Sequence, residues 1–196
     1  MQGGSMSTRT LGLIGSAAGG LENIRPSLIE PAIARGWQVA VTLTPTAGTW
    51  LQDSGELQRI EDVTGLPCRV SPRMPTENSP HPPIDCYLVC PASSNTVAKL
   101  ALGLADNQAL TSVCEAIGGQ VVPVVVFPRI NAAHVRQPAW NSHIDALCSV
   151  GVHLLIGEDI WPLHEPRSAP GKDLPWSKIL DAVDAIVPGQ GPSTPS

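Results

Sequence analysis

The sequence predicts an α/β fold in which helices cover both faces of a parallel sheet. Short apolar runs alternate with helical stretches along the 196 residues, an arrangement typical of parallel sheets wrapped on both sides. The runs are continuously apolar, as expected for strands that are buried on two faces. The length fits one domain that can bury a continuous core. We therefore expect a single Rossmann-like (flavodoxin-like) domain.

Five strands and a set of intervening helices make up this prediction. The expected strands are residues 11–15, 38–43, 85–90, 121–127 and 152–156. Pro123 fits poorly in the fourth, because proline cannot donate a ladder hydrogen bond. A helical segment up to Arg35 is expected to be kinked or delayed by Pro26 and Pro31, with Gly36 as its cap. Further helices are expected after a turn at 44–51 and in residues 95–105, 109–117, 139–150 and 176–186.

The domain boundaries follow from composition. Residues 1–6 (MQGGSM) look like a cloning remnant ahead of a native Met6, residues 7–187 form the domain, and the Pro/Gly/Ser-rich residues 188–196 are expected to be a disordered tail. Two proline-rich stretches, 65–84 and 157–175, break the alternating pattern. Loops this long in a compact domain are usually functional or mobile.

Charge and cysteine content narrow the class of protein. The net charge is −5, with no cluster of Lys and Arg, so we expect neither a nucleic-acid partner nor a membrane partner. Only 15% of residues are charged, which favours self-association. The five cysteines show no CxxC spacing, so they are interpreted as core residues in a reducing compartment, and no metal site is expected. We find no signal peptide and no apolar run long enough to span a membrane, which predicts a cytoplasmic protein.

Small polar residues follow four of the predicted strands. In an open parallel sheet, ligands bind beyond the carboxyl ends of the strands. Glycine, hydroxyl and amide residues there allow backbone N–H groups to approach a phosphate. None of these segments contains a lysine, which disfavours a P-loop nucleotide site. The first segment does not match GxGxxG, which disfavours an ordinary dinucleotide-binding fold. A tight turn at Gly15-Ser16, and helix capping by Ser93, Ser94 and Thr96, are the structural alternatives. The segments are Gly15-Ser16-Ala17, Thr44-Pro45-Thr46, residues 91–96 and residues 128–131.

The third segment carries a resemblance to a known family. Residues 91–96 (PASSNT) resemble the PASANT motif of the homo-oligomeric flavin-containing cysteine decarboxylases, with Ser94 in place of Ala. The following VAKLALGLADN is similar to the family's helix and its Ala-Asp-Asn turn, here Ala105 to Asn107. Residues 128–135 (PRINAAHV) fall where the family has PxMNxxMW. The resemblance covers about residues 10–156.

The resemblance implies FMN, which is expected ahead of FAD. The phosphate would be held by the Gly15-Ser16 loop, Thr44 and the Ser93-Ser94 turn, and Ala17, Thr46 and Ala92 would also bind the cofactor. The residues Asn95, Asp106 and Asn107 would lie near the cofactor. Asn131 would hold the substrate carboxylate. The family builds its site between the subunits of a trimer, and trimers often assemble into dodecamers.

The implied reaction is oxidative decarboxylation of a C-terminal cysteine in a precursor peptide. The flavin oxidises the thiol to a thioaldehyde, and the neighbouring carboxylate then leaves as carbon dioxide, so that an enethiol remains. The protein must hold the thiol, flavin and carboxylate in register and help a proton to move.

The sequence departs from the family in three places. The family's base-like His aligns near Glu77, four residues before His81, so His81 is one candidate base. His134 replaces an apolar residue and is a second candidate. No ACGDxG-like flap follows the fifth strand, and 157–175 contains no Cys. The missing flap favours a peptidyl-cysteine decarboxylase over a phosphopantothenoylcysteine decarboxylase. A non-catalytic regulatory flavoprotein is the other alternative.

Overall fold

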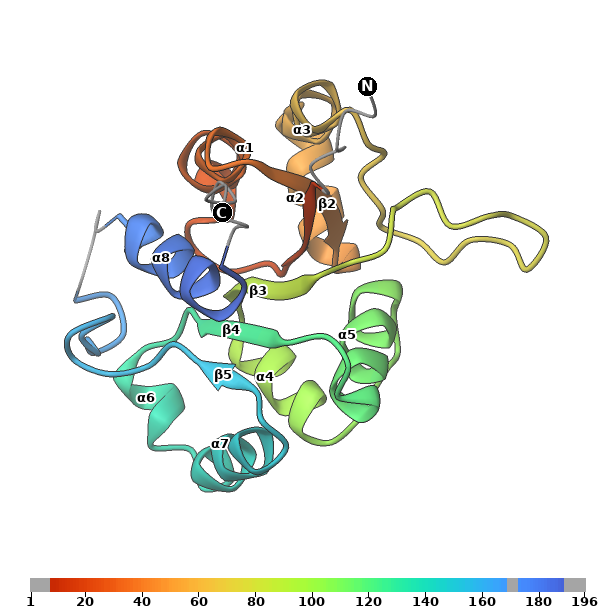
Figure 1. Ribbon diagram of the computed structural model, residues 1–196. Coiled ribbons are helices and arrows are strands. Elements are labelled where there is room, and N and C mark those ends of the chain that lie inside the picture. Colours follow the sequence, from red (N-terminus) through yellow and green to blue (C-terminus); the bar gives the residue numbers. More distant parts are fainter. Residues whose placement is uncertain (1–7, 169–172, 189–196) are drawn as a thin grey trace, which may run out of the picture.

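The computed structural model describes residues 8–168 and 173–188, which form a five-stranded parallel sheet between two layers of helices (Figure 1). The strand order is β2-β1-β3-β4-β5, the flavodoxin-like order. The predicted fold class is confirmed. The proposed remnant at 1–6 and the predicted tail, apart from Pro188, lie outside the described residues. The strands are β1 (Arg9–Gly15), β2 (Trp37–Leu43), β3 (Cys86–Ala92), β4 (Val124–Pro128) and β5 (His153–Leu154).

One layer covers the face on which Leu11, Leu13 and Val41 are buried. It begins with a 3-10 turn η1 (Leu21–Asn23) and a π-helical turn η2 (Arg25–Ile29), which run into α1 (Glu30–Ala34). Pro26 and Pro31 each stand in a first turn, so the prolines divide this segment as predicted, and Gly36 ends it with φ of +86°. The layer also contains α2 (Pro45–Asp53), α3 (Glu56–Thr64) and α8 (Trp176–Ile186).

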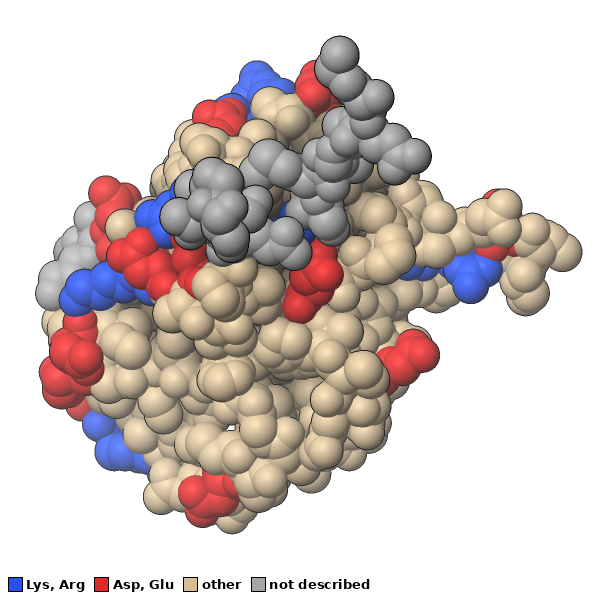
Figure 2. Space-filling model, in the orientation of Figure 1, with Lys and Arg blue, Asp and Glu red and all other residues tan. Residues whose placement is uncertain are grey.

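The second layer covers the face that buries Ile14, Val89 and Val126. It consists of α4 (Ser94–Ala101), α5 (Gln108–Gly119) and α7 (Trp140–Ser149), and the short α6 (Ala132–Val135) precedes α7. These helices pack mainly under β3, β4 and β5 (Figure 1). Charged side chains gather around α1 and α8, whereas the surface over β4, β5 and α5 is largely uncharged (Figure 2).

Several predicted boundaries were wrong. The fourth strand begins at Val124 and not at 121, because Pro123 lies ahead of it and contributes only its carbonyl, which accepts from the Tyr87 N–H at 2.9 Å. Helix α4 ends at Ala101, four residues early, and Gly103 then turns the chain with φ of +68°. β5 is only two residues long, and α3 and α6 were not predicted.

The cysteines are only partly core residues. Cys86 and Cys90 are buried in β3 as expected, and burial raises the pKa of the Cys86 thiol to about 12. Cys68 and Cys114 are half-buried, while Cys148 is exposed on α7, so the interpretation was wrong for Cys148. No helix in the described part of the chain combines the length and apolarity needed to cross a bilayer.

Candidate functional site

The turns after β1, β2 and β3 are hydrogen-bonded to one another at the carboxyl edge of the sheet. Ser16 donates from its backbone N–H and its hydroxyl to the Pro91 carbonyl, at 3.2 and 2.7 Å. Its Oγ also accepts from the Ser93 N–H at 2.8 Å. The Thr44 N–H donates to the Gly15 carbonyl at 2.9 Å. These three predicted segments therefore form one structural unit where the strand order reverses, and the fourth segment is joined to it by the Arg129 N–H, which donates to the Ala92 carbonyl at 2.8 Å.

A cavity of about 500 Å³ opens on this unit, a size within the range of small-molecule sites. It collects most of the predicted cofactor-binding residues. They are Ser16, Ala17, Thr44, Thr46, Ser93, Asn95, Asp106 and Asn107. Five other residues also line it: Pro45 and Thr96, which belong to the predicted segments, and Trp50, Lys99 and Leu110, which the sequence did not indicate.

Helices α2, α4 and α5 all begin at this cavity, with Thr44, Ser93 and Asn107 as their N-caps. The first N–H groups of a helix have no partner within it and carry partial positive charge. Three such ends favour an anion, and a phosphate is the common occupant of sites of this kind. The capping alternative is confirmed for Ser93, whose Oγ accepts from the Thr96 N–H at 3.2 Å, whereas Ser94 and Thr96 lie within α4. Capping and ligand binding are compatible here, since the cap uses the side chain and leaves backbone N–H groups at the cavity.

Lys99 supplies a cation that the sequence analysis missed. It lies one helical turn after Asn95 on α4, and the i, i+4 spacing places both residues on one face of the helix. Lys99 Nζ donates to Asp106 Oδ2, and this hydrogen bond lowers the pKa of the Asp106 carboxyl. Lys99 lies inside α4, beyond the strand-end turns to which the sequence pattern assigned the site.

Three predicted cofactor residues stand just outside the cavity lining. Gly15 and Ala92 end β1 and β3, and Ser94 is the first residue of α4. A Cβ on Gly15 would lie 2.7 Å from Leu43 Cδ2. Glycine at position 15 is therefore explained by packing between β1 and β2.

The predicted catalytic residues Asn131 and His134 lie after β4 and bind each other. Asn131 Oδ1 accepts from the His134 N–H at 3.2 Å, and the Asn131 N–H donates to His134 Nδ1 at 3.4 Å. This reciprocal capping box begins α6. Neither side chain lines the 500 Å³ cavity. They stand near a separate apolar cavity of about 250 Å³ that Ile130 and Val135 help to line.

The third predicted catalytic residue, His81, lies in the proline-rich loop, apart from Asn131 and His134. Its Nε2 lies 2.8 Å from the Pro67 carbonyl, within the proline-rich loop. Burial lowers the pKa of the imidazole, and the nearby Arg69 lowers it further. Within one chain, the structure therefore does not bring His81 to the 500 Å³ cavity or to Asn131.

Arg129, the residue after β4, is a feature that the sequence analysis named only as part of a segment. Its N–H donates to the Ala92 carbonyl at 2.8 Å, and its guanidinium lies 4.7 Å from the centre of the Trp161 ring. Burial lowers the pKa of Arg129. In the described part of the chain, Arg129 Nε and Trp161 Nε1 are the buried side-chain nitrogens that lack a hydrogen-bond partner. The sequence signal for Arg129 was a single cation in the turn that follows a strand.

Solved structures with this fold include flavin-dependent enzymes. The FMN-binding protein AtHal3 matches with a TM-score of 0.63 at 18% identity, over 94% of this chain and 99% of that one. The FMN-dependent cysteine decarboxylase SpaF matches with a TM-score of 0.59 at 20% identity, over 91% and 98%. TvaF, an FMN-dependent cysteine decarboxylase from thioviridamide biosynthesis, matches with 0.56 at 24% identity, over 76% and 90%. At these identities the likeness establishes the fold.

Curated relatives match over shorter stretches. A cysteine/cysteine sulfinic acid decarboxylase from an unknown prokaryotic organism is 37% identical over 71 residues, which is 36% of this chain and 19% of the relative. The coenzyme A biosynthesis bifunctional protein CoaBC of Thermococcus kodakarensis is 31% identical over 88 residues, 45% and 19% respectively. These matches span only about a fifth of the relatives' length. The family match is broader, because it extends over residues 7–187. The chain therefore belongs to the Flavoprotein family.

Proposed function

We propose that this protein binds FMN in the 500 Å³ cavity and uses it to decarboxylate the C-terminal cysteine of a precursor peptide oxidatively, giving an aminoenethiol. The observation that carries the proposal is the convergence of three helix N-termini with the PASSNT turn at one cavity. The decarboxylase names of the relatives and of the similar structures support the choice of reaction.

The residues at the cavity fit a flavin phosphate. The lining offers neutral hydroxyl and amide groups, helix N-termini and one lysine, it has no glycine-rich P-loop, and its one carboxylate, Asp106, is paired with that lysine. Trp50, which is 48% exposed, lines the same cavity, and its indole ring gives the cavity a flat apolar surface. A bound flavin supplies a two-electron acceptor for the cysteine thiol.

The residues of this chain would divide the remaining tasks. The N–H groups at the starts of α2 and α4 and the Lys99 ammonium hold the phosphate. Asn131 is proposed to hold the peptide carboxylate, and its capping box with His134 fixes the direction of its side chain. Because Asn131 and His81 lie away from the cavity in one chain, the proposal includes a homotrimer, in which a neighbouring copy completes each site.

The direct test uses purified protein with FMN and a synthetic peptide that ends in cysteine. We expect yellow protein, release of carbon dioxide, and a peptide that has lost carbon dioxide and two hydrogens by mass spectrometry. A matched peptide that ends in serine should remain unchanged. Sedimentation or light scattering should give three copies per particle or a multiple of three. Absence of the mass change across a panel containing the protein's own precursor would contradict the reaction.

A second function is supported by a specific observation. His81 and His134 are both removed from the flavin cavity within one chain, and each forms a local hydrogen bond. A non-catalytic flavin-binding protein would have the same cavity without a nearby base. Tight flavin uptake, with no reduction by any cysteine-ended peptide under anaerobic conditions, would favour this second function.

A further inference from the structure

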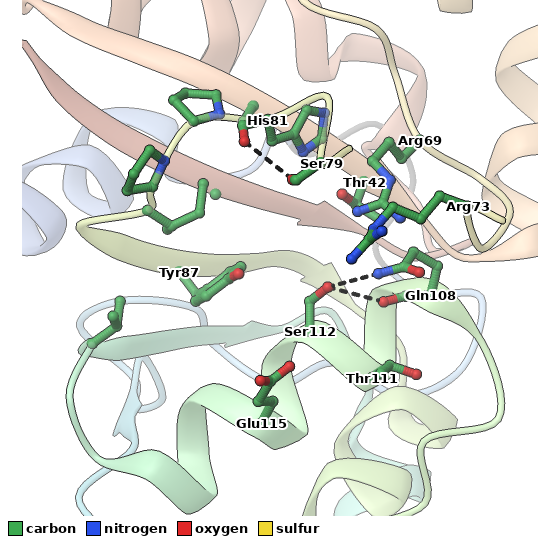
Figure 3. A pocket seen from close by; sticks show the side chains of 16 residues that line it. Thr42, Arg69, Arg73, Ser79, His81, Tyr87, Gln108, Thr111, Ser112 and Glu115 are labelled. Atoms are coloured by element: carbon green, nitrogen blue, oxygen red, sulfur yellow. Dashed lines mark hydrogen bonds between the residues drawn. The ribbon is translucent and has the colours of Figure 1, made fainter. Parts of the chain in front are cut away.

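A larger cavity, of about 690 Å³, lies on the sheet face away from α1 and α8 (Figure 3). Its floor contains Gly12, Ala40 and Thr42, which stand at neighbouring positions on β1 and β2. One wall is α5, and the other is the proline-rich loop. Apart from Gln108, which begins α5, its lining lies away from the carboxyl-edge turns, and it shares no lining residue with the proposed flavin cavity.

The cavity exists because the chain crosses this face without a helix. The backbone at Arg69 forms a parallel bridge with Thr42 at the sheet edge, and the chain then runs as turns and bends to β3. Small floor residues leave further room. The Tyr87 ring lies over Gly12, where a Cβ would come within 2.7 Å of the ring.

Two arginines face this cavity without a carboxylate partner. The backbone of Arg69 is fixed on β2, since its N–H donates to the Val41 carbonyl at 3.0 Å and its carbonyl accepts from the Leu43 N–H at 2.7 Å. Burial lowers the pKa of the Arg69 guanidinium, and the neighbouring Arg73 lowers it further. Arg73 donates to the Glu77 carbonyl. By contrast, ion pairs with Asp or Glu are formed by Arg9, Arg25, Arg35, Arg59 and Arg136.

The opposite wall gives the cavity two chemically different ends. Gln108 and Ser112 stand on α5 across from the arginines, and Gln108 Nε2 donates to Ser112 Oγ at 3.0 Å (Figure 3). Burial raises the pKa of the Tyr87 phenol, and Glu115, two turns after Gln108 on α5, raises it further. At 1.5 Å rise per residue, Gln108 and Glu115 are separated by about 10 Å along the helix. An anion therefore fits only the arginine end.

We propose that this cavity binds a small organic molecule through a carboxylate or phosphate group held by Arg69 and Arg73. Guanidinium groups form paired hydrogen bonds with both kinds of oxyanion. Two neighbouring guanidinium groups repel each other, and a bound oxyanion removes this repulsion. The hydroxyl group of Thr42 on the cavity floor adds a neutral donor, whereas the Ser79 hydroxyl on the loop wall donates to the His81 carbonyl at 3.1 Å.

The chain offers a specific probe, because Tyr87 is its only tyrosine and lies in this cavity. Protein as purified, labelled with ¹³C in the tyrosine ring, is titrated separately with inorganic phosphate and with succinate while the single ring signal is followed. We expect a saturable shift with at least one of the two. Saturation by phosphate alone indicates a phosphorylated ligand, and saturation by succinate alone indicates a carboxylate ligand.

The variants Arg69→Gln and Arg73→Gln should each weaken this binding at least about tenfold, as expected for loss of one charged hydrogen-bonding partner. Arg59→Gln, which removes the same charge from an exposed position on α3, should leave it unchanged. Arg73 is an exposed loop residue, so its variant remains informative if Arg69→Gln fails to fold. No saturable shift with either anion, or an unchanged titration in both cavity variants, would overturn the proposal. Flavin uptake is measured separately on the same samples and does not enter this test.

Discussion

The turns that follow β3 and β4 both supply the N-cap of a helix, but only the turn after β3 lines the proposed flavin cavity. Each supplies an N-cap, Ser93 for α4 and Asn131 for α6. The turn after β3 is joined to Ser16 and lines the 500 Å³ cavity together with two other helix N-termini. The turn after β4 is also joined to its neighbour, because the Arg129 N–H donates to the Ala92 carbonyl at 2.8 Å, but the side chain of its cap Asn131 accepts from His134 and does not line the cavity. A capping residue therefore becomes a candidate ligand-binding residue where neighbouring turns meet it, which here is between β1 and β3.

The largest expected effect tests whether the turn after β4 serves the substrate. Asn131→Ala should lower decarboxylation by roughly 100-fold or more, since a preorganised donor to the substrate is lost, while the flavin content stays unchanged. Steady-state rates and flavin absorbance measure both quantities. Asn141→Ala, an exposed amide on α7, is the matched control. If Asn131→Ala lost its flavin instead, the two turns would serve the same ligand and the contrast between them would disappear.

The next effect concerns the link between the turns after β1 and β3. Ser16→Ala removes the buried hydroxyl that accepts from the Ser93 N–H and donates to Pro91. We expect a loss of about 1–3 kcal/mol in the free energy of unfolding, because the partly buried Ser93 N–H is left without its acceptor. Urea unfolding measures this loss. Ser149→Ala, whose hydroxyl is exposed, should cost much less. Equal costs for the two variants would mean that the link does not stabilise the site.

A smaller effect is expected from Lys99, the cation that lines the 500 Å³ cavity. Lys99→Met should weaken FMN binding roughly tenfold, the value of one charged hydrogen bond. Fluorescence titration measures the dissociation constant at fixed ionic strength. Lys178→Met, on α8, provides a control with the same change of charge. Because riboflavin has no phosphate, its affinity should be the same in the Lys99→Met variant and the parent protein; a matching loss for riboflavin would place Lys99 at the ring.

The smallest expected effect is a change in pH dependence caused by His81. Burial lowers the pKa of His81 in the folded protein from its ordinary value of 6.5. As the pH falls through about 6.5, the unfolded chain takes up a proton that the folded chain does not, so the free energy of unfolding decreases. His81→Gln should reduce the loss of stability between about pH 7.5 and 5.5. Urea unfolding at both values measures it, and an unchanged or steeper loss would contradict the burial of a neutral imidazole.

The sequence predicted the fold class and much of the candidate site because both follow from local patterns. Continuous apolar runs mark strands buried on two faces, and the residues after them necessarily gather at one edge of a parallel sheet. That logic correctly placed Ser16, Thr44 and Ser93 at one cavity. It could not show that Asn131 and His134 would bind each other, since capping depends on the direction of single side chains.

Other features were out of reach for related reasons. Helix α3 was missed because its residues Glu56–Thr64 are mostly polar and only Ile60 is buried. Lys99 reaches the cavity from the second turn of α4, and strand-end patterns do not predict which helical side chains turn toward a cavity. The 690 Å³ cavity results from a helix that is absent between Arg69 and β3, and the spacing of apolar residues does not predict the shape of such a crossing.

The hydrogen bonds around Ser16 have a consequence for recognising related sites in other chains. The PASSNT turn takes its shape partly from a serine that lies 77 positions earlier, so the motif consists of two separated pieces. Grafting residues 91–96 alone into another parallel sheet would leave the amide of Ser93 without its acceptor. A search pattern that requires a glycine-serine pair after the first strand, together with the later hexapeptide, should therefore separate genuine sites from chance matches to the hexapeptide.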